Sequence, residues 1–95
     1  MNGGKKARGI EYGTKYLRSF KKLHALAKRK AHEKEAIFRT SPFDKRLDTH
    51  KLHGKFQDYW SYSVDNKNRV IFRFLDDGGI LSFDIGLHPI YGKGE

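Results

Sequence analysis

The chain has 95 residues and a formal charge of +9, from 20 Lys and Arg against 11 Asp and Glu. This length allows one domain with one modest core and excludes a second, and so strong a positive charge is typical of proteins with an anionic partner, most often nucleic acid, although an acidic protein or a membrane surface would fit as well. The absence of cysteine excludes disulfides and thiolate metal sites, and no apolar run resembles a signal peptide or a membrane span, which favours a reducing cytoplasm and no membrane partner.

The N-terminal residues 1–9 are rich in glycine and basic residues and have no hydrophobic periodicity. They predict a mobile basic tail, followed by a single domain over residues 10–95. Residues 10–12 predict a short first strand.

Two helices are expected next. Apolar residues recur at helical spacing, first at Tyr16, Leu17, Phe20 and Leu23, and then at Leu26, Ala27, Ala31 and Ile37 or Phe38. Thr14 is the expected N-cap, and Pro42 ends the second helix because it cannot extend the hydrogen-bond ladder. We expect a break near residues 23–25; a single bent helix is the alternative.

Three strands are predicted after a polar connector over residues 44–55. The runs 59–64, 69–75 and 80–85 are short and rich in aromatic or β-branched residues, and their connections have hairpin length. Gly78 and Gly79 are expected to supply the positive φ of the second hairpin. The prediction is an α+β fold, with two N-terminal helices packed on one face of an antiparallel sheet of three to four strands.

Strand alternation predicts which side chains face the helices. The inward set is Val70, Phe72 and Phe74, with Trp60, Tyr62 and Val64, and Leu81, Phe83 and Ile85. The outward set is Arg69, Ile71 and Arg73, with Ser61, Ser63, Ser82 and Asp84. Trp60 is therefore expected in the core and not on a base-stacking platform.

The outward face is polar and cationic, and histidines are expected along its rim at positions 50, 53 and 88. Cleavage of RNA through its 2′-hydroxyl needs a base, an acid and fixed positive charge near the phosphate. Histidine serves either proton role because its pKa lies near neutrality. Arginines and histidines on one surface therefore predict a phosphate-binding surface, and these residue types can cut RNA without a metal.

The run DTHKLHGKFQDYWSYSVDNKNRVIFRF, followed by DIGLH, resembles the RelE/StbE group of bacterial toxins, particularly its YafQ-like branch. The resemblance implies a RelE/ParE-like toxin fold. It also implies a type II toxin–antitoxin module whose toxin cuts mRNA in the ribosomal A site, close to ribosomal RNA, and is silenced by a cognate antitoxin. No cofactor and no metal are implied.

The resemblance also assigns roles by position. It implies that His50 and His88 are catalytic, that Arg69 binds the scissile phosphate, and that Tyr91 stacks near the cut. The neighbouring residues expected to contact RNA are Lys51, His53, Lys55 and Arg73. Ser63 replaces a third histidine of the YafQ-like pattern and Lys67 replaces an acid, which leaves the identity of the general base open.

Simpler interpretations stand beside these. The loop histidines could be solvated, the trio His50, His53 and His88 could bind zinc, and Arg69 and Arg73 could pair with Asp65 and Asp84. Zinc is disfavoured because no acidic or thiolate partner lies at motif spacing. Two other functions also remain open: a ParE-like inhibitor of DNA gyrase without catalysis, and a non-catalytic RNA-binding module.

Overall fold

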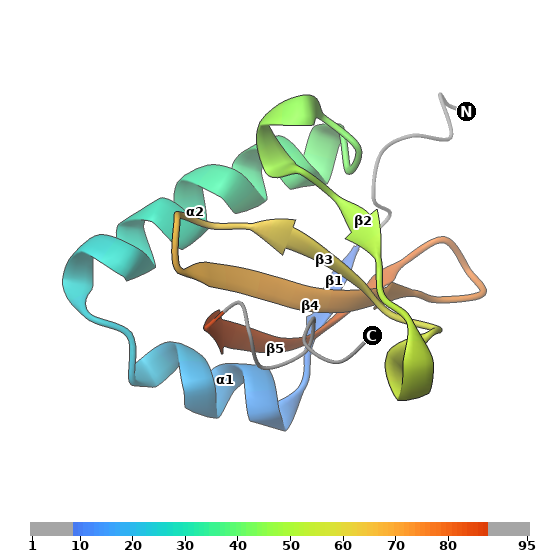
Figure 1. Ribbon diagram of the computed structural model, residues 1–95, viewed down its shortest axis with the longest axis horizontal. Helices are drawn as coiled ribbons and strands as arrows, with labels where there is room; N and C mark the ends of the chain where they lie inside the picture. Colours follow the sequence, from blue (N-terminus) through green and yellow to red (C-terminus); the bar gives the residue numbers. More distant parts are fainter. Residues whose placement is uncertain (1–8, 88–95) are drawn as a thin grey trace.

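The computed structural model describes residues 9–87, which form two α-helices and a five-stranded sheet (Figure 1). The elements are β1 (Ile10–Tyr12), α1 (Thr14–Lys21), α2 (Ala25–Thr40), the 3-10 turn η1 (Lys45–Leu47), β2 (His50–Lys51), the 3-10 turn η2 (Gly54–Phe56), β3 (Trp60–Ser63), β4 (Asn68–Phe74) and β5 (Ile80–Leu87). The predicted tail, apart from Gly9, lies outside the described residues. Neither helix is long and apolar enough to cross a bilayer.

The sheet is mixed, which corrects the prediction of an antiparallel sheet of three to four strands. Its order is β1-β5-β4-β3-β2, and β1 runs parallel to β5, with Ile10 opposite Ile80. The other three pairs are antiparallel. In the chain, both helices and three strands separate β1 from β5, and this connection is long enough for the crossover that a parallel pair requires.

The helices are separate, as predicted, and the single bent helix is excluded. The backbone N–H of Gly13 donates to the carbonyl of Ser82 at 2.9 Å, so the chain remains extended through residue 13. Gly13, and not Thr14, is therefore the N-cap of α1. His24 is the N-cap of α2, and its Nδ1 accepts a hydrogen bond from the N–H of Ala27 at 3.3 Å.

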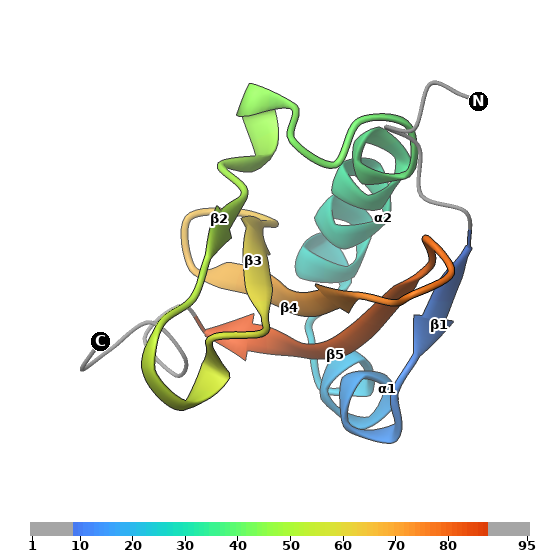
Figure 2. The ribbon, with the colours of Figure 1, turned by 90° about the vertical axis from the view of Figure 1, so that its right-hand side faces the viewer.

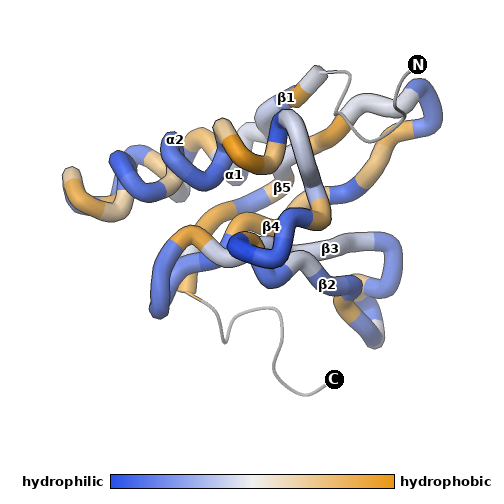
Figure 3. The backbone as a smooth tube through the Cα atoms, turned by 90° about the horizontal axis from the view of Figure 1, so that it is seen from above, coloured by the Kyte–Doolittle hydropathy of each residue, from blue (hydrophilic) through white to orange (hydrophobic). Residues whose placement is uncertain are grey.

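The core lies between the helices and one face of the sheet (Figures 2 and 3). Phe38 of α2 is fully buried, and its ring centroid lies 4.4 Å from that of Tyr62 and 4.7 Å from that of Phe72. The inward set predicted on β3 and β4 is thus confirmed at its centre. At the end of the sheet, Trp60 is half-buried and Phe74 is partly exposed, packed edge to face.

The faces of β5 are wrong in the prediction, except at Ile85. Ser82 and Asp84 are buried, whereas Leu81 and Phe83 are only partly so. The register passes from Ile71 opposite Asp84 to Phe72 opposite Ser82, so β5 holds one extra residue. This bulge changes the alternation of the strand. It turns the Asp84 carboxylate towards α1, where Ser19 donates to it at 2.6 Å.

The β4–β5 hairpin needs one left-handed residue. Gly78 has a φ of 90°, whereas the predicted positive φ at Gly79 is not present. We expect Gly78→Ala to lower the free energy of unfolding by about 1–2 kcal/mol, because a Cβ disfavours this backbone region. Urea denaturation measures the change. Gly9→Ala is the control: its Cβ would meet no atom within 4 Å, so a loss as large as that of Gly78→Ala would contradict the explanation.

Candidate active site

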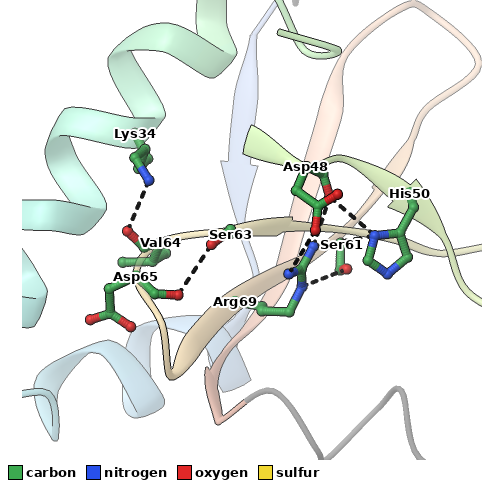
Figure 4. A network of polar contacts seen from close by, with 8 residues as sticks. All are labelled: Lys34, Asp48, His50, Ser61, Ser63, Val64, Asp65 and Arg69. Carbon is green, nitrogen blue, oxygen red and sulfur yellow. Dashed lines mark hydrogen bonds and ion pairs between the residues drawn. The ribbon is translucent and has the colours of Figure 1, made fainter. Parts of the chain in front are cut away.

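Arg69 lies on the central strand β4, on the face opposite the helices, and it is 8% exposed. Its Nε donates to Ser61 Oγ at 2.9 Å, and its Nη2 donates to the backbone carbonyl of Asp48 at 2.8 Å (Figure 4). Two different elements therefore hold the guanidinium in one position. The predicted open face is covered at this point by the chain that leads into β2.

The charge of Arg69 is partly balanced within the site. The Asp48 carboxylate, itself 75% exposed, lies 3.6 Å from Nη1. Burial lowers the pKa of Arg69, and the charge and hydrogen bonding of Asp48 act in the opposite direction. An arginine remains protonated near neutral pH, so this is a fixed, buried cation. The alternative prediction that Arg69 forms an ion pair with Asp65 is wrong, because the carboxylate next to Arg69 is that of Asp48.

His50 reaches the same guanidinium. It begins β2 and pairs with Ser61 of β3, which places its ring beside the end of Arg69. His50 Nδ1 lies 3.0 Å from the Asp48 carbonyl oxygen and 3.3 Å from Arg69 Nη2. The structure therefore brings together two of the residues predicted from the sequence, 19 positions apart in the chain.

These residues line an open cleft of about 480 Å³. Its lining residues are Asp48, His50, Ser63, Asp65, Asn66 and Arg69. A buried cation at one wall, with an exposed imidazole beside it, can bind a phosphodiester and move a proton on it.

The far wall is the turn between β3 and β4. The Asp65 carboxylate accepts from the backbone N–H groups of Lys67 and Asn68 at 2.8 and 2.7 Å. Ser63 Oγ donates to the Asp65 carbonyl at 3.1 Å. Lys34 of α2 donates to the carbonyl of Val64 (Figure 4). Two positions that depart from the YafQ-like pattern, 63 and 67, thus take part in building this turn.

The Asp65 turn predicts a pH dependence of stability. Burial alone would raise the pKa of Asp65, but hydrogen bonds from Asn68 and Lys67 outweigh it, and the pKa is lowered. The ionised Asp65 carboxylate therefore stabilises the folded protein at pH values above its unfolded-state pKa, which is near 4. This stabilisation is lost as the pH falls through the lower pKa that Asp65 has in the folded protein. We expect Asp65→Ala to be less stable than wild type at pH 7, with the difference shrinking below about pH 4 in chemical denaturation. A difference that grows in acid would contradict this.

The remaining predicted site residues fall into three groups. Lys51 on β2, His53 directly before η2 and Lys55 on η2 are exposed. Arg73 is half-buried on β4, on the same face as Arg69. Its backbone pairs with Leu81 of β5, but its side chain forms no hydrogen bond or ion pair with any residue in the range 9–87, so the alternative pairing of Arg73 with Asp84 is not found there. His88 and Tyr91 lie outside the described residues. Within the described range, no three histidine or acidic side chains gather as a metal site would require.

Two residues that build the site, Asp48 and Ser61, are not among those that the sequence predicts for it. The sequence predicts only that Ser61 lies on the outward face. Asp48 has a φ of 50°, and aspartate is among the few residues other than glycine that adopt this conformation at moderate cost. Neither contact has a signal in the local sequence pattern, because each depends on where β2 pairs.

No protein-family model and no curated protein matches the sequence, but its structure is similar to solved structures. A YoeB/ParE toxin from Agrobacterium tumefaciens superposes with a TM-score of 0.72 at 14% identity, over 84% of this chain and 98% of the other. YafQ from Escherichia coli gives 0.63 at 19% identity, over 83% and 91%. The RelBE2 toxin–antitoxin complex from Mycobacterium tuberculosis gives 0.72 at 14% identity, over 87% and 93%. The fold is that of RelE/ParE-like toxins, which confirms the expectation from the sequence.

Proposed function

We propose that this protein is the toxin of a type II toxin–antitoxin module and that it cleaves mRNA on the ribosome without a metal. The observation that carries the proposal is the meeting of buried Arg69 and exposed His50 in one cleft. The fold supports it, because similar solved structures include a YoeB/ParE toxin and two toxin–antitoxin complexes. Fold alone does not determine function, so the site is the stronger support.

The reaction is a phosphoryl transfer within the RNA. A base removes the proton of the 2′-hydroxyl, the 2′-oxygen forms a bond to phosphorus, and the bond to the 5′-oxygen breaks as an acid protonates it. The products are a 2′,3′-cyclic phosphate and a 5′-hydroxyl. Arg69 binds the non-bridging oxygens, where charge accumulates in the transition state. His50 and His88 share the proton transfers, and Tyr91 stacks on or orients a base.

The basic surface around the cleft binds the RNA backbone. Lys51, His53 and Lys55 are exposed residues of the segment that begins with His50, and Arg73 lies along β4 from Arg69. Such contacts predict that affinity falls steeply with salt, with a slope of about 0.7–0.9 per phosphate neutralised. The same surface, on a chain of charge +9, suits an acidic antitoxin that covers it.

Induced expression tests the proposal. Wild-type protein should arrest growth by stopping translation, and primer extension on ribosome-bound message should locate cuts that are absent when ribosomes or toxin are omitted. Co-expression of a small acidic protein encoded beside the gene should restore growth. Intact message in arrested cells would reject the nuclease.

The alternative is gyrase inhibition, which the similarity to a YoeB/ParE toxin favours. A gyrase inhibitor needs no acid–base pair and would cause DNA damage and filamentation before translation slows. Comparing the rates of DNA and protein synthesis in the first minutes after induction separates the two functions. A third outcome, neither arrest nor cleavage, would indicate a non-catalytic RNA-binding module.

A further inference from the structure

We propose that Asp48 is the positioning residue of this site, and that its backbone carbonyl sets both the tautomer of His50 and the orientation of Arg69. The inference rests on the proposed function and deepens it. It starts from one atom: the Asp48 carbonyl oxygen lies 2.8 Å from Arg69 Nη2 and 3.0 Å from His50 Nδ1 (Figure 4). Among the hydrogen bonds within residues 9–87, this oxygen is the one acceptor that both side chains share.

The contact with His50 selects a tautomer. A carbonyl oxygen only accepts, so its 3.0 Å contact is a hydrogen bond only when Nδ1 carries the proton. The competing contact, from Arg69 Nη2 to Nδ1, needs a bare Nδ1 and is longer at 3.3 Å. Arg69 Nη2 already has the Asp48 carbonyl as acceptor at 2.8 Å. The geometry therefore favours Nδ1–H, which leaves Nε2 with the lone pair that a base requires.

The contact with Arg69 leaves donors for a phosphate. A guanidinium has five N–H groups. One at Nε is used by Ser61 and one at Nη2 by the Asp48 carbonyl. With Nδ1 of His50 protonated, one N–H at Nη2 and both at Nη1 remain. The exposed Asp48 carboxylate, 3.6 Å from Nη1, is the group that an incoming phosphate displaces.

The carbonyl points into the site because of the backbone at Asp48. Asp48 has a φ of 50° and a ψ of 47°, and within residues 9–87 it is the one residue other than glycine with a positive φ. This left-handed conformation ends η1 and directs the chain into β2. Glycine adopts it freely, whereas a β-branched residue strongly resists it.

Two variants separate the carbonyl from the carboxylate. Asp48→Gly and Asp48→Val both remove the carboxylate, but only glycine accepts the left-handed backbone. The first measurement is the ¹⁵N–¹H correlation of the imidazole side chains in full-length protein without RNA, with His50 assigned by comparison with His50→Gln. We expect Nδ1–H in wild type and in Asp48→Gly, and a shift towards Nε2–H in Asp48→Val.

The second measurement is single-turnover cleavage of mRNA on programmed ribosomes at saturating toxin. Asp48→Val should be about 5- to 30-fold slower than Asp48→Gly, which reflects the population cost of the left-handed backbone. Thermal unfolding of both variants reports whether the valine form is folded. If Asp48→Val is unfolded, the wild-type spectrum still tests the proposal, because it shows which nitrogen of His50 carries the proton.

An Nε2–H tautomer in the wild type, or the same tautomer and rate in the glycine and valine variants, would overturn the proposal. The spectra involve no RNA and no ribosome. A protein that holds Nδ1–H through Asp48 but leaves mRNA intact would therefore reject the nuclease function and not the positioning. Cleavage with the wrong tautomer would reject the positioning and not the nuclease.

Discussion

Arg69→Ala is expected to reduce mRNA cleavage on ribosomes by about 10²–10³-fold, because it removes the preorganised cation that faces the phosphate. Arg69→Lys should recover only part of this loss. A lysine ammonium cannot donate simultaneously to Ser61, to the Asp48 carbonyl and to a phosphate in the fixed geometry of a guanidinium. Single-turnover cleavage at saturating toxin measures the effect on the chemical step.

Folding must be checked alongside. Loss of the guanidinium removes the donor to the Ser61 hydroxyl and one of the two donors to the Asp48 carbonyl, at a cost of about 1–3 kcal/mol, so thermal unfolding of each variant is recorded. Arg73→Ala is the matched control, with the same charge removed from the same strand and face. Arg73→Ala should mainly lower the affinity for RNA and reduce the dependence of that affinity on salt concentration. An Arg73→Ala defect in the chemical step as large as that of Arg69→Ala would refute the assignment.

His50→Ala is expected to slow the chemical step by about 10²–10⁴-fold, the range for a positioned proton-transfer group. The side chain is exposed, so its removal should change the free energy of unfolding by less than about 1 kcal/mol. Loss of activity with unchanged stability would place the effect in catalysis. The two quantities are measured by single-turnover cleavage and by urea denaturation.

His53→Ala is the control for this prediction. His53 lies three positions further on, is exposed and makes no capping hydrogen bond with its side chain. Its loss should affect RNA binding more than the rate at saturation. Should His50→Ala cut at the wild-type rate, the proton transfers would belong elsewhere, and His50 would serve only to bind RNA.

The local elements were predictable because each has a strong period. The stripe that includes Tyr16 and Phe20 predicted one helix, and the run before Pro42 predicted the other. The break was predicted near residues 23–25 and lies between Lys21 and Ala25. The alternation along β4 correctly placed Val70 and Phe72 in the core. These features depend on neighbours within a few positions, which is the range that a hydrophobic pattern reports.

The mixed sheet and the bulge were not predictable in this way. Strand β1 pairs with a strand 70 positions away, and nothing in its three residues encodes that partner or its direction. The extra residue in β5 reversed the expected sides of Ser82 and Phe83. An alternating hydrophobic pattern cannot predict where a strand contains one extra residue, because a bulge is defined only by the pairing with the neighbouring strand.

The charge, the helices, the main strands and the presence of arginine and histidine on one side of the sheet follow from the amino-acid sequence. The burial of Arg69, its hydrogen bonds to Ser61 and Asp48, and the contact of His50 with the same carbonyl became known from the folded chain. The difference lies in distance along the chain. Composition and periodicity act locally, whereas the burial of a charge and the sharing of one acceptor arise when separate segments meet.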